Sequence, residues 1–166
     1  MNVLSYQELI GLRDNIVSNT LQKVDNNTLT AFNILAISGL RIQELYNIFT
    51  AEYQGNNMFL VYTLKGSFVR YIDFKIYTPL ILECISQQQT IFLPQSKATI
   101  ERNFVTACNY VNLYVKEKGI ETHFFRHVLM KEYNQNGLSV TQIKQRFGLS
   151  SDNVVNSYIN SQIYTK

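Results

Sequence analysis

Tryptophan is absent from this sequence, and the 166 residues include only 2 Cys, 2 Pro and 7 Gly. Cys84 and Cys108 are too few for a disulfide framework and lack the spacing of metal ligands, which indicates a reducing, intracellular compartment. Because few Pro and Gly residues punctuate the chain, and no repeat or linker divides it, we expect a single compact domain.

Charged residues are also scarce, at 16% of the chain against 46% hydrophobic residues, which excludes a disordered tail. No apolar run is long enough to span a membrane, and the strongest one, 31–37, is interrupted by Asn33. Residues 1–8 lack the basic start and apolar block of a secretory signal. We therefore expect a cytoplasmic protein without a membrane partner.

The small net charge of +3 is unevenly distributed. Residues 1–96 carry 6 Lys and Arg against 7 Asp and Glu, whereas residues 97–166 carry 9 against 5. A weakly basic balance permits nucleic-acid binding without arguing for it. If the chain binds DNA, we expect the C-terminal part to supply most of the electrostatic attraction.

Helix signals dominate the pattern. Ser5 with Glu8 forms a capping box, Thr78-Pro79 places Pro at the start of a helix, and Ser139 with Gln142 is a further cap. The expected helices cover about 5–17, 25–38, 41–48, 97–118, 122–135 and 139–148, with one more after Pro79 and a last one from Ser151.

Between these helices the period changes to that of strands. Residues 58–63 and 69–74 are β-rich runs joined by 64–68, which predicts a hairpin, and residues 91–93 predict a short third strand. The expected fold class is α+β, mainly helical, with one small antiparallel sheet whose hairpin covers about 58–74.

Taken one at a time, the polar residues favour ordinary roles. Arg41 and Glu44, three residues apart, predict a surface ion pair worth less than about 1 kcal/mol. Lys65 in a hairpin turn is typical of a solvated side chain. His123 and Arg126 lie on one helical face, where a lone His is most often structural. Tyr158 continues an apolar stripe, which favours packing in the core.

Four motifs that contain these residues, taken together and in order, indicate a shared functional role. They are GLRIQEL at 39–45, LKGSFVR at 64–70 in the predicted hairpin, THFFRH at 122–127 at a helix start, and FGLSS at 147–151 followed by Tyr158. From Ser5 to Tyr158 the chain resembles the catalytic domain of tyrosine recombinases, the phage integrase family. That family has G-L-R-x-x-E-L, K-G-x-x-x-R, H-x-x-R-H and L-G-H-S-S, with the nucleophilic tyrosine nine residues after the last His.

The resemblance implies five catalytic residues. Tyr158 would attack the scissile phosphorus and form a 3′-phosphotyrosine, while Arg41 and Arg126 clamp the non-bridging oxygens. Lys65 would protonate the leaving oxygen, and His123 would accept the tyrosine proton or bond the phosphate.

Two further residues would support these five. By the same resemblance Glu44 orients Arg41 or holds its helix, and His127 is structural. No metal or cofactor is required, because the arginines supply the positive charge. The implied partners are duplex DNA and further copies of the chain on that DNA, with no small-molecule substrate. The implied activity is DNA recombination or integration of a mobile element or phage.

Leu149 departs from the family pattern because it occupies the position of the second motif histidine, and Leu donates no hydrogen bond. The chain also begins with the first helix of the catalytic domain and shows no N-terminal core-binding domain, so we expect residues 1–166 to form one recombinase-like catalytic domain. Only eight residues follow Tyr158, a short tail for exchange between subunits.

Three alternatives stay open. A catalytically impaired member would bind DNA or a partner recombinase without cutting, and Leu149 is its main support. A type IB topoisomerase would share the chemistry. Residues 139–159 also fit a helix-turn-helix regulator, although the second helix has no Lys or Arg and the reading leaves Arg41 and Lys65 unexplained.

Overall fold

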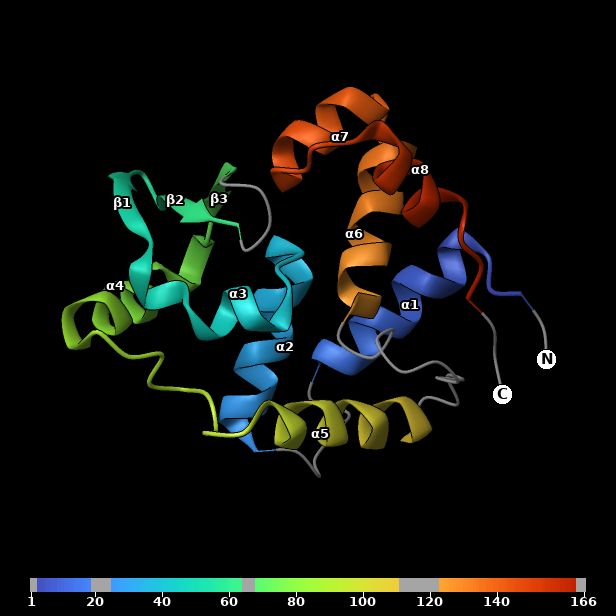
Figure 1. The fold of residues 1–166 in the computed structure, drawn as a ribbon. Helices are drawn as coiled ribbons and strands as arrows, with labels where there is room; N and C mark the ends of the chain where they lie inside the picture. The colour runs from blue at the N-terminus through green and yellow to red at the C-terminus, as the bar shows by residue number, and fades with distance from the viewer. Residues whose placement is uncertain (1–2, 19–24, 64–67, 111–122, 164–166) are drawn as a thin grey trace.

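A computed structural model describes residues 3–18, 25–63, 68–110 and 123–163 (Figure 1). Helices predominate in these residues, with one small sheet on one side. The helices are α1 (Tyr6–Val17), α2 (Asn26–Ser38), α3 (Ile42–Tyr46), α4 (Thr78–Gln87), α5 (Lys97–Tyr110), α6 (His123–Gln135), α7 (Val140–Phe147) and α8 (Asp152–Asn160). Short 3₁₀ turns follow α3 at Ile48–Thr50 and precede α4 at Lys75–Tyr77.

The predicted caps at Ser5 and Ser139 are present, and Asp25 caps a third helix. The Ser5 hydroxyl accepts from the Glu8 backbone N–H at 3.2 Å, and the Glu8 carboxylate accepts from the Ser5 N–H at 3.1 Å. Ser139 and Gln142 repeat this box at α7, and Asp25 accepts from the third residue of α2. Because each cap satisfies backbone N–H groups that a helix start leaves unpaired, local sequence determines where these helices begin.

Helix boundaries depart from prediction at two places. The helix expected over 41–48 is divided into α3 and a 3₁₀ turn, and α4 takes Tyr77 as its N-cap with Thr78 as its first residue. The predicted end of the long helix at Lys118 lies outside the described residues. None of the helices in the described ranges is long and apolar enough to span a membrane.

The sheet is antiparallel, in the order β1 (Glu52–Gly55), β2 (Met58–Tyr62), β3 (Val69–Asp73). β2 and β3 pair in register from Met58 opposite Asp73 to Tyr62 opposite Val69, which confirms the predicted hairpin strands. Alternate residues of β3 point inward, so Arg70 and Ile72 are buried while their neighbours are exposed.

The third strand lies elsewhere than predicted. Residues 91–93 form turns, and the strand is β1 at 52–55. An Asn56-Asn57 turn joins β1 to β2 with φ of +52° and +64°, the geometry of a tight hairpin connection. β1 is polar and mostly exposed, so apolar patterning could not reveal it.

Two apolar clusters meet on α6, which stands near the centre of Figure 1. On one side Phe125 packs against Phe32 of α2 and Phe104 of α5, with ring centroids 5.7 and 5.4 Å away. On the other side Leu129 and Met130 join a smaller cluster with α7 and α8. Since a buried Phe contributes roughly 1.5–3 kcal/mol, α6 is held firmly between α2 and the C-terminal helices.

Candidate active site

The turn between α2 and α3 determines where the first arginine lies. α2 ends at Ser38, and Gly39 continues with φ +64° as its C-cap. A Cβ on Gly39 would lie 2.9 Å from Phe147 Cζ and 3.0 Å from Leu129 Cδ2, so another residue would be strained and crowded. Arg41 then becomes the N-cap residue of α3 at the edge of this turn.

Glu44 links two arginines. Its carboxylate accepts from the Arg41 backbone N–H at 2.8 Å and lies 3.3 Å from Arg41 Nη1. The same carboxylate lies 3.9 Å from Arg126 Nη1. The surface ion pair expected for Arg41 and Glu44 alone is wrong, because Glu44 is only 2% exposed.

Arg126 is the most deeply buried charged side chain of this group, at 1% exposure. Its Nη1 donates to the Gly39 carbonyl at 2.7 Å, while its Nε and Nη2 have no partner among the described residues. Burial, together with the charge of Arg41, lowers the pKa of Arg126 to about 10, while Tyr158 and Glu44 act in the opposite direction. The guanidinium therefore stays charged at neutral pH with unused hydrogen-bond donors.

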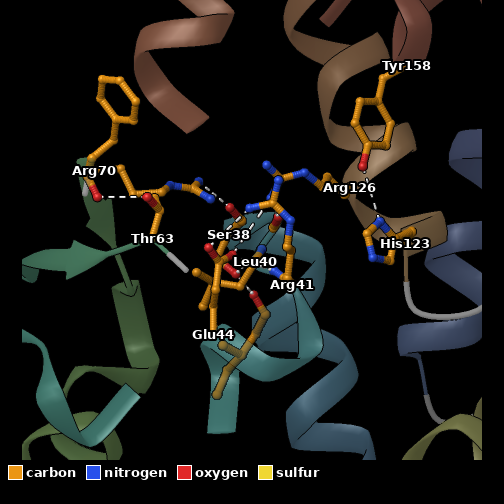
Figure 2. A network of polar contacts seen from close by, with 12 residues as sticks. Ser38, Leu40, Arg41, Glu44, Thr63, Arg70, His123, Arg126 and Tyr158 are labelled. Atoms are coloured by element: carbon orange, nitrogen blue, oxygen red, sulfur yellow. Dashed lines mark hydrogen bonds and ion pairs between the residues drawn. The ribbon is translucent and has the colours of Figure 1, made fainter. Parts of the chain in front are cut away.

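Tyr158 reaches this group from α8. Its hydroxyl lies 3.2 Å from His123 Nδ1, and the two rings are nearly parallel. The Arg126 Cζ lies 5.8 Å from the Tyr158 ring centroid. Figure 2 shows the phenol pointing toward His123, with Arg126 and Arg41 on the neighbouring side. Residues from α3, α6 and α8, far apart in sequence, thus meet at one place.

The segment after Tyr158 is fastened to α6. Ser161 Oγ donates to the Tyr158 carbonyl at 2.9 Å and lies 2.8 Å from His127 Nδ1. Lys131 Nζ donates to the carbonyls of Ile159 and Ser161 at 2.6 and 2.8 Å. These contacts hold the end of α8 against α6 and keep the phenol near His123.

His127 packs edge-on against the Tyr158 ring, with centroids 4.5 Å apart. Burial, together with the nearby charges of His123, Lys131 and Arg126, lowers the pKa of His127 to about 4. His127 is therefore neutral at physiological pH, which suits a residue that supports the ring of Tyr158.

A surface cavity of about 480 Å³ opens beside the phenol. Its lining residues are His123, His127, Asn153, Val154, Ser157, Tyr158 and Ser161. Among the described residues no group of three His, Cys, Asp or Glu side chains could hold a metal ion. The groups that meet beside this cavity are the phenol of Tyr158, the imidazoles of His123 and His127, and the guanidinium of Arg126.

Comparison of the sequence with protein families identifies its relatives. The family model described as "Phage integrase family" matches residues 6–163. The chain belongs to the phage integrase family. A search of curated proteins found no significant match.

Solved structures of integrase-family recombinases share this fold. XerA recombinase superposes on 97% of this chain with a TM-score of 0.64 and 18% sequence identity. A lambda integrase (75–356) dimer bound to a COC′ core site superposes on 96% of this chain with a TM-score of 0.63 and 15% sequence identity. XerH site-specific recombinase bound to a palindromic difH substrate, a post-cleavage complex, gives 0.66 at 15% over 96%. This chain spans 59%, 59% and 50% of those three chains.

In this integrase-family chain, Leu149 lies in the smaller apolar cluster. It follows the helix-ending Gly148, which has φ +61°, and its backbone N–H donates to the Lys144 carbonyl at 3.0 Å. Its partly buried side chain packs with that cluster, as Tyr158 does. The position that carries a His in the family motif is therefore apolar here.

Lys65 lies outside the described residues. The ends of its hairpin are nevertheless paired, since the Thr63 N–H donates to the Phe68 carbonyl at 2.9 Å. Gly148 approaches the same strand ends, because a Cβ there would lie 2.8 Å from Thr63 Cγ2 and 3.6 Å from Arg70 Cβ. The hairpin base thus adjoins the turn that carries Leu149.

Sequence reasoning gave no role to Arg70, Lys131 or Phe147, all of which contact the residues described above. The signal for Arg70 was present, because it occupies an inward position in the alternating pattern of β3. Lys131 could not be distinguished from a solvated helix lysine, since its partners are backbone carbonyls about thirty residues away.

Proposed function

We propose that this chain is a tyrosine recombinase domain that cuts and rejoins strands of duplex DNA through a 3′-phosphotyrosine intermediate. One observation supports this most strongly: the Tyr158 phenol meets His123 at 3.2 Å, beside a guanidinium that shares Glu44 with Arg41. Nucleophile, base and anion-binding groups are the parts that transesterification at a phosphodiester needs.

The proposed step conserves every atom and charge. The Tyr158 oxygen attacks the phosphorus while its proton passes to His123. The bond from phosphorus to the 5′ oxygen breaks, and that oxygen leaves with the electron pair and takes a proton from Lys65. The new phosphotyrosine bond retains the free energy of the broken phosphodiester. Attack by a 5′ hydroxyl therefore rejoins the strand without ATP.

The arginines would stabilise the charge that develops on the phosphate. Arg126 has two buried nitrogens, Nε and Nη2, without hydrogen-bond partners among the described residues, and Arg41 also contacts Glu44. A planar guanidinium donates two parallel hydrogen bonds to phosphate oxygens. Loss of one such preorganised donor typically costs about 3 kcal/mol in the barrier.

The proposal extends to partners and setting. Similar structures carry titles that describe complexes with a core site and with a difH substrate, and one title describes a dimer. We infer duplex DNA as the partner and self-association on that DNA. We assign the activity to recombination or integration of a mobile element or phage in the cytoplasm, with residues 1–166 as the catalytic domain.

A second candidate is an impaired family member that binds DNA without cutting it. The specific support is Leu149, which packs in an apolar cluster and cannot donate to a phosphate. Cleavage and binding assays on the same DNA distinguish the two functions.

A pool of duplexes tests the proposal. Each duplex carries a randomised segment and a nick in one strand, placed so that after cleavage the short fragment that bears the freed 5′ hydroxyl diffuses away and resealing fails. We expect wild type to form an SDS-stable adduct and Tyr158→Phe to form none. Binding without any adduct would favour the impaired member, and an adduct with Tyr158→Phe would reject the assignment of the nucleophile.

A further inference from the structure

We propose that Arg70 is a third cation beside the phosphate that Arg41 and Arg126 would bind. It is a positioning residue, and it acts through the turn between α2 and α3 that leads to Arg41. This inference rests on the proposed function. Arg70 is 4% exposed and reaches inward from β3. In Figure 2 its guanidinium lies next to Ser38, on the opposite side of the arginine cluster from Tyr158.

Arg70 and Arg126 hold neighbouring points of one turn. Arg70 Nη2 donates to the Ser38 carbonyl, and Arg126 Nη1 donates to the Gly39 carbonyl. Two residues further on, Arg41 begins α3. The turn is therefore held from both sides by guanidiniums, and removal of either one frees a carbonyl that fixes the backbone leading to Arg41.

Both guanidiniums lie against the ring of Phe147, which is itself buried. Arg70 Cζ lies 4.6 Å and Arg126 Cζ 4.9 Å from its centroid. Both contacts are of the cation–π type. Since both groups flank one ring, they lie no more than about 10 Å apart, a range over which buried charges interact despite salt.

The charge of this cluster is not balanced. Arg41, Arg70 and Arg126 bring three positive charges, while the ion pairs recorded for them in the described residues reach only Glu44. Arg70 Nε and Nη1 have no partner there either. Burial, and after it the charge of Arg126, lowers the pKa of Arg70 to about 9, while Glu44 acts in the opposite direction. A phosphate would supply the missing negative charge.

A purely structural role explains this arrangement poorly. Buried ionic groups are often replaced by apolar residues of similar volume with no loss of stability, and unpaired buried N–H groups lower stability. Met at position 70 would remove a buried charge and two unpaired nitrogens, although it would also leave the Ser38 carbonyl without this donor. The observed arginine is consistent with a requirement for charge at that position.

The cleavage test uses duplexes that yield an adduct with wild type, once with a normal scissile phosphate and once with a neutral methylphosphonate. We expect Arg70→Met to cleave the phosphate about 10- to 100-fold more slowly, because it removes a buried charge within about 10 Å of Arg126 and frees the Ser38 carbonyl of the turn that leads to Arg41. The methylphosphonate should reduce the defect to about threefold or less, because its missing charge is what Arg70 stabilises. An equal defect on both substrates, or none on the phosphate, overturns the inference.

Arg13→Met is the matched control. Arg13 is a partly buried arginine on α1, paired with Glu132 and Asp14. Figure 1 shows α1 on the other side of α6 from β3. Its loss should lower stability without changing cleavage of either substrate by the folded protein. Arg70→Lys keeps the charge and should recover most of the rate on the phosphate.

A second measurement keeps this inference separate from the proposed function. Sulfate, a dianion, should raise the melting temperature of wild type, Arg13→Met and Arg70→Lys more than that of Arg70→Met. Equal sulfate shifts in all four proteins overturn the role of Arg70, even if Tyr158 forms an adduct. If no duplex yields an adduct but the sulfate difference is present, the anion site stands and the cleavage proposal fails.

Discussion

Leu149 is the residue at which packing and the proposed chemistry conflict. Its side chain packs with the cluster that also receives Tyr158, while the family motif has an imidazole donor at this position. The conflict gives a direct test of whether this position limits the rate.

Leu149→His is expected to raise the rate of strand cleavage about tenfold, because a preorganised donor stabilises charge that develops only in the transition state. Leu149→Ala removes the same packing without adding a donor and should not raise the rate. Single-turnover cleavage of the nicked duplexes measures both variants. An unchanged or lower rate for Leu149→His counts against a limiting role for Leu149.

His127 gives the protein a pH dependence of stability. In the unfolded chain a His takes up a proton below about pH 6.5, whereas in the folded protein the pKa of His127 is about 4. Between these values only the unfolded state gains the proton, so the stability is present above pH 6.5 and is lost as the pH falls toward 4. The expected loss is roughly 1–3 kcal/mol.

Urea denaturation between pH 7 and pH 4 measures this effect. His127→Gln cannot take up the proton, so its stability should fall less steeply than that of wild type, and the two curves should converge toward pH 4. Parallel curves across that interval would show that the imidazole is not protected from protonation in the folded state.

At the scale of elements, the α2–α3 turn carries the site, and Gly39 is its least replaceable residue. Gly39→Ala is expected to lower the free energy of unfolding by about 2–4 kcal/mol, because a Cβ at positive φ is strained and would collide with Phe147. Cleavage should fall as well, since the turn positions Arg41.

Gly11→Ala provides the matched control for this turn. Gly11 lies inside α1, and a Cβ there meets nothing within 4 Å. The variant should gain about 0.5–1 kcal/mol from helix propensity and keep its cleavage rate. Similar unfolding free energies for the two variants would contradict the tight contact between Gly39 and Phe147.

The elements also show what the sequence could and could not predict. Caps such as Ser5 and Ser139 act within four residues, so the helix starts were predictable. The β2–β3 hairpin followed from two β-rich runs. Strand β1 was missed because its side chains are polar and exposed, although Asn56-Asn57 was a usable turn signal.

The site was predictable as a set of residues but not as a set of contacts. Motif order placed Arg41, His123, Arg126 and Tyr158 together, and the structure brings these four together. The burial of Glu44 and the inward guanidinium of Arg70 depend on how α3, α6 and β3 pack. Such tertiary packing leaves no local signature, so it had to be observed.

At the scale of the whole molecule, charge distribution governs the expected affinity for DNA. Binding should weaken linearly in log–log plots as salt rises, because each phosphate contact releases counterions. Replacing the exposed Arg102 and Arg146 together by Gln should reduce the slope of log affinity against log salt concentration by up to about two. Lys75→Gln, which lies in the acidic part of the chain, should change this slope less. Filter binding at several salt concentrations measures this, and an affinity that barely responds to salt would contradict it.

The most direct test of the central claim is to identify the protein atom that becomes linked to DNA. Adducts formed on nicked duplexes are digested with protease and nuclease, and the nucleotide-bearing peptide is sequenced by mass spectrometry. We predict a single modified residue, Tyr158, linked through its phenolic oxygen to a 3′ phosphate. A nucleotide on any other residue, or a linkage to a 5′ phosphate, would contradict the account.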